Sequence, residues 1–420
     1  MNIMNQQHLS SWLIVDGFGS GKHYAKLLNE LGIQVYHVQS VEEVADYFKK
    51  SFDKSQYSAT FVHAGDYEKL LSELRLIQDL AVVVPGCETG VALADLLSED
   101  LGTPTNGRFK SEARRNKFNM VESLQESGVR AARTFRVGSL AELEGISEAL
   151  GLPAVVKPCA SAGSDRVYIC KTKAELVDGF NDIICNPTIF GATNTHVIAQ
   201  QLLVGKQYIV NSISYDGRHF MSEIWEDNRE DVGSAYIYNY ERLLHDRGQL
   251  EQTLMEYTSA VLDALGVRYG PCHVELMVHE GVPTLIEVGA RPAGGIQHEV
   301  LQDAQGYSHV SATIDCYLGR GLPPSYFDTK HAKHVVSVSL INRISGVLKG
   351  YRYIDKIEAL ASFRCLVGLP DIGAQLHVSR SLDTQPGILM LSHANLQQVL
   401  QDVDTFRAIE FDGIFELEGC

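Results

Sequence analysis

The 420-residue sequence lacks the features that would place it in a membrane, a secretory route or a nucleic-acid complex. No stretch approaches the ~18 consecutive apolar residues that a membrane helix needs. Residues 1–11 do not have the basic-then-apolar pattern of a signal peptide. The 36 Lys and Arg residues are outnumbered by 52 Asp and Glu residues, and the resulting net charge of −16 repels polyanions. We therefore expect a cytoplasmic protein that binds neither a membrane nor nucleic acid.

The sequence also lacks clustered cysteines. Its eight cysteines are scattered and form no CxxC pair, which is typical of reduced and mostly buried thiols. His273 and Glu275 form half of a zinc-deaminase signature, but the downstream Pro-Cys-x-x-Cys that this chemistry needs is missing. The sequence therefore predicts no zinc site.

A glycine-rich loop at residues 16–23 matches neither common nucleotide-binding fingerprint. A Walker A loop needs Gly where this chain has Asp16, and Ser or Thr where it has His23. A dinucleotide fingerprint needs a third Gly where the chain has Lys22. We expect a strand-to-helix turn at a sheet edge, with a ligand-lining role as the alternative.

The pattern of apolar residues changes along the chain. In the first hundred residues, short apolar runs alternate with amphipathic helical segments, which indicates β-α-β units on a mainly parallel sheet. After residue 153, strands with tight turns, such as 219–224, indicate antiparallel pairing. Tyr236, Tyr238 and Tyr240 share one face of a strand by alternation, and a packed aromatic stripe is favoured over a substrate wall. The last ninety residues mix strands with a further helix.

The segment 273–291 is the most informative, because it reads as two alternating strands around a Gly-containing turn. If the apolar residues of both strands face the core, Ile286 and Val288 among them, Glu275 and Glu287 share the opposite face.

This shared face constrains the turn. Position 275 must pair with 287 across an odd-length loop centred on Gly281, because a two-residue turn would place the carboxylates on opposite faces. Facing carboxylates ~5 Å apart repel each other unless a cation lies beside them. Mg²⁺ accepts a few carboxylates together with phosphate oxygens. The hairpin therefore predicts a Mg²⁺ site, and a solvated sheet face is the alternative.

Candidate phosphate-binding elements precede the hairpin. Lys157 ends an apolar strand, where a buried ammonium group needs an anionic partner. The following loop of small residues, 159–167, can close over phosphates and offer them backbone N–H groups. Lys117 lies on an earlier predicted helix, and the strand 197–205 could present backbone groups to an adenine edge.

This order of elements resembles the ATP-grasp superfamily of carboxylate–amine ligases, most closely the L-amino-acid ligases, which are dipeptide synthetases. The resemblance extends from about residue 110 to 319, and its most specific parts are 270–275 and 286–295. It implies an α/β and α+β architecture with a two-lobed antiparallel ATP-grasp core. The implied division is a parallel α/β domain (1–109), a small lobe with the phosphate lid (110–195), a large lobe with the Mg²⁺-binding hairpin (196–330) and a C-terminal α+β subdomain (331–420).

The resemblance also implies roles for individual residues. Glu275 and Glu287 would hold Mg²⁺, for which Mn²⁺ could substitute. Arg291 would face the reacting carboxyl group as a catalytic residue, and His273 would line the phosphate or substrate side. The residues implied to contact ATP are Lys117, Lys157, Ser161, Gly163, Ser164, Gln200, Gln201, Leu203 and Gln207.

Three positions depart from the family pattern. Relatives usually have Glu at position 200 and often at 207, whereas this chain has Gln200 and Gln207. The amide oxygen of Gln can still accept a hydrogen bond from adenine or ribose. Gly289 stands where the superfamily commonly has Asn, which matches the amino-acid ligases and removes one possible metal ligand.

The implied function is an ATP-dependent ligase that joins two L-amino acids through an aminoacyl phosphate and yields a dipeptide, ADP and phosphate. Its partners would be small-molecule amino acids, and the family likeness favours a homodimer. One alternative is a ligase that couples an amino acid to a non-amino-acid carboxylate or amine. The other is a catalytically silent nucleotide-binding module.

Overall fold

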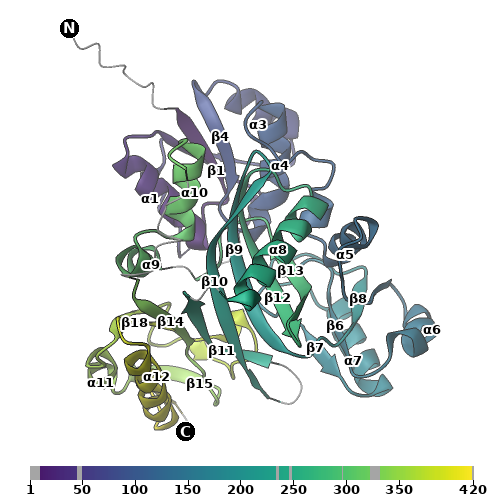
Figure 1. Ribbon diagram of the computed structural model, residues 1–420, viewed down its shortest axis with the longest axis vertical. Helices are drawn as coiled ribbons and strands as arrows, with labels where there is room; N and C mark the ends of the chain where they lie inside the picture. The colour runs from purple at the N-terminus through teal and green to yellow at the C-terminus, as the bar shows by residue number, and fades with distance from the viewer. Residues whose placement is uncertain are drawn as a thin grey trace.

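The computed structural model describes residues 10–44, 50–232, 236–245, 248–295, 297–321 and 332–418. The first sheet is parallel and has the strand order β3-β2-β1-β4. Its strands are β1 (Ser11–Val15), β2 (Val35–Gln39), β3 (Ala59–Val62) and β4 (Leu80–Pro85), and its helices are α1 (Lys22–Glu30), α3 (Tyr67–Leu74) and α4 (Val91–Asp100). Figure 1 shows β1 beside β4. Apolar clusters bury both faces of the sheet, as a parallel α/β layer requires. The predicted N-terminal α/β fold is confirmed.

A second, antiparallel sheet follows, with the order β5-β8-β6-β7. Its strands are β5 (Thr134–Val137), β6 (Ala154–Pro158), β7 (Tyr168–Cys170) and β8 (Val197–Gln201), and the helices around it are α5 (Lys117–Glu126), α6 (Leu140–Leu150) and α7 (Lys173–Cys185). Apolar residues of α6 and α7 cover one face and form a core with it. The other face is left free to line a cleft.

The largest sheet is antiparallel and has eight strands in the order β13-β12-β9-β10-β11-β14-β18-β16. Its first five strands are β9 (Lys206–Tyr215), β10 (Arg218–Asp231), β11 (Tyr236–Leu244), β12 (Gly270–His279) and β13 (Val282–Gly289), and α8 (Gln249–Ala264) packs on one face. The strands β14 (His334–Ser339), β16 (Phe363–Val367) and β18 (Ile388–His393) extend this sheet from the C-terminal part of the chain. The predicted antiparallel core is confirmed, whereas the four domain limits remain a prediction.

The remaining elements surround this sheet. A small sheet combines β15 (Gly346–Tyr351), β17 (Gln375–Leu376) and β19 (Phe415–Leu417). The helices α11 (Ile354–Glu358) and α12 (Leu396–Phe411) pack against the C-terminal strands of the large sheet. The helices α9 (His298–Gln305) and α10 (His309–Tyr317) connect the large sheet to the first one. Val310 and Ile314 of α10 pack into the core of the parallel sheet, and the ring of Tyr317 lies edge-on to Trp12 at 5.3 Å. The N-terminal layer is therefore anchored to the core.

The turn of the β12–β13 hairpin differs from the prediction. His279 pairs with Val282, so that the loop has two residues, Glu280 and Gly281. Their φ angles of 50° and 79° are those of a type I′ hairpin turn, for which Gly is well suited. The expectation of an odd-length loop was wrong.

A β-bulge places Glu275 and Glu287 on the same face of the hairpin, which the two-residue turn alone would prevent. Glu275 pairs with Glu287 as predicted, but Leu276 pairs with Leu285, which leaves Ile286 as an extra residue. Leu285 therefore enters the core, and Ile286, which was predicted to lie there, lines a cavity. The paired carboxylates share a face because of the bulge and not because of the loop length.

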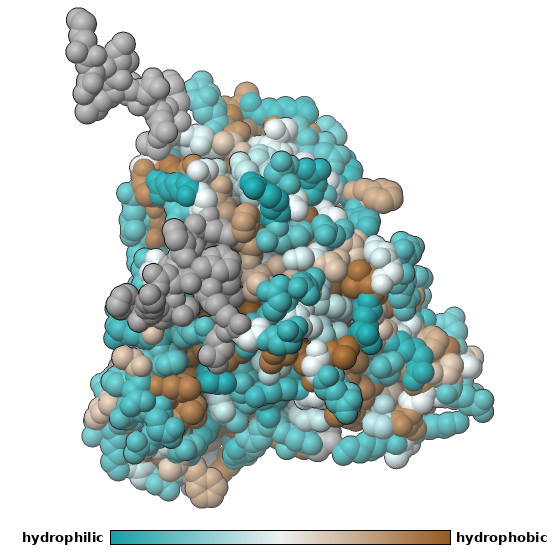
Figure 2. Space-filling model, viewed as in Figure 1, coloured by the Kyte–Doolittle hydropathy of each residue, from teal (hydrophilic) through white to brown (hydrophobic). Residues whose placement is uncertain are grey.

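In the part of the chain that the structure describes, no helix has the length and apolarity to cross a bilayer. The seven described cysteines are all free thiols. Figure 2 shows polar side chains over most of the visible face, with apolar residues in small separate groups.

Candidate active site

Two cavities meet at the Glu275–Glu287 pair. The smaller cavity, of about 150 Å³, lies between the β5-β8-β6-β7 sheet and the end of the large sheet. The larger cavity, of about 230 Å³, lies over the large sheet. Both cavities are lined by Arg229, Tyr238, Glu275 and Glu287. The carboxylate pair thus stands at the junction between two compartments.

Lys117 supplies a cation to this pair. It is the first residue of α5, whose N-terminus is capped by the Asn116 side chain, and its Nζ lies 2.7 Å from Glu287 Oε2. Burial opposes the charged form of Lys117, but the carboxylate of Glu287 raises its pKa above the ordinary value. A lysine on an isolated helix would face solvent, and only the docking of α5 brings this one to the site.

Lys157 has the opposite electrostatic situation. It is 5% exposed on β6, and its ammonium group has no hydrogen-bond or ion-pair partner among the described residues. Burial, together with the nearby charge of Lys117, lowers its pKa to about 8. A buried ammonium group without a direct partner favours an anion, and a triphosphate in the smaller cavity fits that need.

The metal-binding prediction also fits the donor set. Glu275 and Glu287 present facing carboxylates, although no group of three or more His, Cys, Asp or Glu side chains within the described ranges is arranged to hold a metal ion. Mg²⁺ needs only one or two carboxylates when phosphate oxygens complete its shell. Burial alone would raise the pKa of Glu275, but His273, Arg229 and Arg291 lower it to about 2. This carboxylate is therefore ionised and ready to bind a cation.

Arg229 is a site residue that the sequence interpretation missed. Its guanidinium group binds Asp227 at 2.7 Å, lies 3.8 Å from Glu275 Oε2 and covers the ring of Tyr238 at 3.6 Å. The strand predicted for 219–224 in fact continues to Asp231, and its alternate residues Glu223, Trp225 and Arg229 line the larger cavity. Their charges concealed a period-two strand pattern.

A hydrogen-bonded chain runs from the carboxylate pair across three strands. His273 Nε2 lies 3.4 Å from Glu275 Oε1, and its Nδ1 lies 2.9 Å from Asn211 Oδ1. Asn211 Nδ2 in turn donates to Glu223 Oε2 at 2.7 Å. Because the amide group of Asn211 is oriented by Glu223, its oxygen accepts a hydrogen bond from the Nδ1–H of His273. The predicted position of His273 beside the substrate compartment agrees with this arrangement.

Arg291 lies in the larger cavity, where its Nε is 3.3 Å from Glu88 Oε2 of the N-terminal layer. A Cβ atom on Gly289 would lie 3.0 Å from the guanidinium carbon of Arg291. The glycine that replaces the family's usual Asn thus provides room for the arginine. Glu88 could not be recognised from the sequence, because nothing local links it to residues two hundred positions away.

The lid loop between β6 and β7 lies over the junction of the cavities and is held by three contacts. The Ser161 carbonyl accepts from Lys117 at 2.6 Å, the Ser164 hydroxyl accepts from Arg229 at 3.4 Å, and the Gly163 carbonyl accepts from the Leu382 N–H at 2.9 Å. Because the last of these comes from the C-terminal segment, the lid bridges distant parts of the chain.

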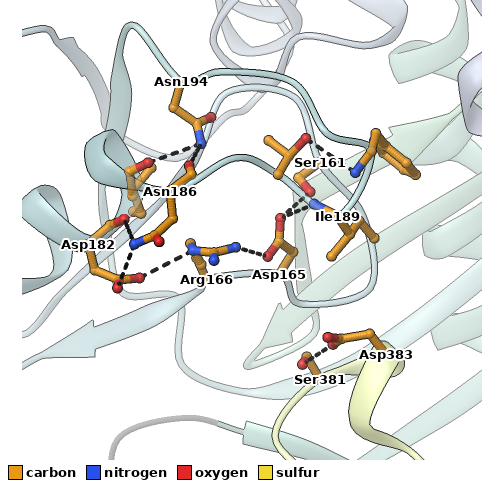
Figure 3. Close-up of polar contacts among 12 residues, drawn as sticks. Ser161, Asp165, Arg166, Asp182, Asn186, Ile189, Asn194, Ser381 and Asp383 are labelled. Carbon is orange, nitrogen blue, oxygen red and sulfur yellow. Dashed lines mark hydrogen bonds and ion pairs between the residues drawn. The ribbon is translucent and has the colours of Figure 1, made fainter. Parts of the chain in front are cut away.

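Figure 3 shows how the base of this loop is fixed. Asp165 accepts hydrogen bonds from the Ser161 hydroxyl at 2.6 Å and from the Ile189 N–H at 3.0 Å. Arg166 lies between Asp165 and Asp182 and forms ion pairs with both. The Ser161 hydroxyl is thus engaged within the loop, and Gly163 and Ser164 are the predicted lid residues that reach the cavities.

The predicted adenine-binding residues line the smaller cavity: Gln200, Gln201, Leu203 and Gln207. Gln200 Nε2 donates to Thr134 Oγ1 at 2.8 Å, and Gln201 Oε1 accepts from the Arg133 N–H. Gln207 Nε2 donates to Glu275 Oε2 at 2.9 Å and therefore supports the carboxylate pair in this state.

The three tyrosines of β11 do not share one face, because a second β-bulge interrupts the strand. Arg229 pairs with Tyr238 and Asn228 pairs with Tyr240, which leaves Asn239 extra. Tyr238 accordingly lines both cavities, while Tyr240 packs into the C-terminal core. The expectation that all three tyrosines share one face was wrong.

The ATP-grasp domain model matches residues 150–299, the part of the chain that forms most of both cavities. Dapdiamide A synthase of Enterobacter agglomerans is 32% identical over 324 residues, which are 76% of this chain and 75% of that protein. The chain belongs to the ATP-grasp superfamily. It is an ATP-dependent ligase that forms carbon–nitrogen bonds, as the family resemblance implied.

Two further ATP-grasp relatives extend this result. Alanine–anticapsin ligase of Bacillus subtilis (strain 168) is 24% identical over 287 residues, which are 62% of this chain and 60% of that protein. The solved L-amino acid ligase from Bacillus licheniformis has a TM-score of 0.76 and 18% identity, and the match covers 98% of this chain and 99% of that one. The ATP-grasp fold therefore extends over the N-terminal and C-terminal parts as well.

Proposed function

We propose that this ATP-grasp ligase joins two L-amino acids into a dipeptide. The carboxylate of the first amino acid attacks the γ-phosphorus of ATP, which gives an aminoacyl phosphate and ADP. The α-amine of the second amino acid then attacks the acyl carbon and expels phosphate, losing one proton. The names of alanine–anticapsin ligase and of the L-amino acid ligase support this substrate class.

The observation that carries the proposal is the junction of the two cavities at Glu275 and Glu287. A carboxylate substrate and a triphosphate are both anions, and cations must bring them together. Lys117 and Lys157 would bind phosphates from the smaller cavity, and Arg291 would hold the carboxyl group from the larger one. Preorganised charges of this kind account for most of the catalysis in phosphoryl transfer.

Glu275 and Glu287 would hold Mg²⁺, which when bound neutralises phosphate charge. The fixed groups around them would position the substrate: His273 beside the pair and Arg229 under the lid. The loop carrying Gly163 and Ser164 would exclude water, since an acyl phosphate hydrolyses if water reaches it.

The proposal is tested by a phosphate-release screen over all pairs of the twenty amino acids with ATP and Mg²⁺. A pair that gives equal amounts of ADP and dipeptide, with ¹⁸O passing from the first carboxylate to phosphate, is the expected result. ADP release with an amino acid and a non-amino-acid amine only would favour the alternative ligase. ATP binding without ADP release from any acceptor would leave a silent nucleotide-binding module.

A further inference from the structure

The floor of the larger cavity is one face of the eight-stranded sheet. Glu223, Trp225 and Asp227 alternate along β10 and therefore share that face, while Glu241 of β11 pairs directly with Asp227. Glu223, Trp225 and Glu241 all line the cavity. Two carboxylates thus lie on this floor, on either side of a tryptophan.

Most other charges around this cavity are balanced. Glu88 is paired with Arg291, and Asp227 with Arg229. The Glu275–Glu287 pair has Lys117 and the proposed metal ion. Glu223 and Glu241 have no ion-pair partner among the residues that the structure describes.

Glu223 has one oxygen that is buried and unused. The residue is 1% exposed, and its Oε2 accepts from both Asn211 Nδ2 at 2.7 Å and Trp225 Nε1 at 3.0 Å. Its Oε1 has no hydrogen-bond partner, although the His309 N–H lies near enough to lower the pKa that burial raises. A carboxylate oxygen without a partner inside a protein is costly unless a ligand satisfies it.

Glu241 is also available to a ligand. It makes no hydrogen bond within the described part of the chain, and burial together with the Asp227 charge raises its pKa to about 8. A bound cation would favour its ionised form.

The surface between the two carboxylates is apolar. It is formed by Trp225 with Ile209 and Leu301, which belong to one hydrophobic cluster. Position 227, which pairs with Glu241, lies four residues further along the strand than position 223, a span of about 13 Å between backbone atoms at the usual rise. Two glutamate side chains that reach inward over this span leave room for two amino groups joined by a short hydrocarbon chain.

We propose that the activated substrate is a diamino acid, with its α-amino group bound by Glu223, its methylene chain on Trp225 and its side-chain amino group bound by Glu241. This inference rests on the proposed function, because that function places an amino acid in this cavity. It adds the chemical class of the side chain. Lysine and ornithine are members of this class with chains of suitable length.

The test compares L-lysine and L-ornithine with L-norleucine, which keeps the length of lysine but lacks the second amino group. Titration calorimetry on the full chain with Mg²⁺ and AMP-PNP should show lysine or ornithine binding at least tenfold more tightly than norleucine. Equal affinities for all three would overturn the proposal. This comparison uses the unmodified protein and needs no variant to fold.

Two variants, one of them a control, test whether Glu241 causes the preference for lysine over norleucine. Glu241→Gln should reduce lysine affinity at least tenfold while changing norleucine affinity less than threefold. Glu230→Gln, at a carboxylate paired with Arg343 outside both cavities, should change neither. An unchanged lysine-to-norleucine ratio in Glu241→Gln would reject the assigned role of Glu241.

The outcomes for substrate class and for function are separable. ADP release that depends on neutral amino acids, with no preference for lysine or ornithine, would reject the diamino acid and keep the dipeptide ligase. Tight lysine binding without ADP release from any pair of amino acids would keep the binding site and reject the proposed dipeptide synthesis.

Discussion

Lys117 Nζ lies 2.7 Å from Glu287 Oε2 and 2.6 Å from the carbonyl oxygen of Ser161. One ammonium group thus joins a proposed metal ligand to the loop that covers the site. If nucleotide and metal bind as proposed, Lys117 must shift from Glu287 to a phosphate, and its contact with Ser161 would transmit that shift to the lid loop.

Replacing Lys117 with Met should destabilise the metal-free protein by about 1–3 kcal/mol, because Glu287 then lies beside Glu275 without its cation. Mg²⁺ should recover part of this loss, since a divalent ion supplies the missing charge. Differential scanning calorimetry in EDTA and in Mg²⁺ measures both effects. The exposed Lys173→Met variant is the control, and an equal loss for Lys117→Met in the two conditions would contradict the prediction.

The bulge predicts opposite effects for two neighbouring residues. Leu285→Ala should cost about 2–5 kcal/mol of stability, because Leu285 is 1% exposed in the core. Ile286→Ala should cost less than about 1 kcal/mol but raise the KM for ATP about tenfold, because Ile286 lines the nucleotide cavity. Urea unfolding and steady-state kinetics separate the two, and the reverse pattern would mean that the hairpin has the regular register.

These two residues also show how far the sequence could lead. The Glu275–Glu287 pairing was predictable, since period-two alternation and a pair of acids are local signals. The bulge at Ile286 was not, because an extra residue leaves no mark in composition. Arg229 and Glu88 reach the site through strand pairing and domain packing, which no local pattern encodes. The fold class followed from the spacing of apolar runs, but the continuation of the large sheet into the C-terminal part did not.

Glu287→Gln should lower kcat by about 10²–10³-fold and weaken the dependence of the rate on Mg²⁺, because a neutral amide is a poor ligand for a hard cation. Glu280→Gln, in the turn of the same hairpin, should leave kcat within about twofold, since its side chain is exposed and lines neither cavity. A Mg²⁺ titration of the initial rate measures both variants. Similar losses in both would point to damage of the hairpin rather than to loss of a ligand.

The low pKa of Lys157 predicts how ATP binding changes with pH. In the free protein this pKa is about 8, and a bound triphosphate should raise it by stabilising the ammonium form. Below pH 8 Lys157 is already charged, so that affinity is at its full value. Above pH 8 the free protein must take up a proton to bind ATP, and affinity should fall by up to tenfold per pH unit. Calorimetry in two buffers of different ionisation enthalpy should detect proton uptake at pH 8.5, and Lys157→Arg should abolish it.

Because Gly163 packs closely against Leu382, we expect the lid to control how tightly ATP hydrolysis is coupled to amide formation. Its φ is +65°, and a Cβ atom there would lie 2.6 Å from Leu382 Cβ, although its carbonyl must accept from the Leu382 N–H. Gly163→Ala should therefore move the lid away from the C-terminal segment. Water would then enter the site and hydrolyse the acyl phosphate. The ratio of ADP to dipeptide should rise above one. Gly128→Ala is the matched control, because its φ of +70° carries the same backbone strain of about 1 kcal/mol with nothing within 4 Å of the added carbon. If both variants keep a ratio of one, the contact with Leu382 does not seal the site.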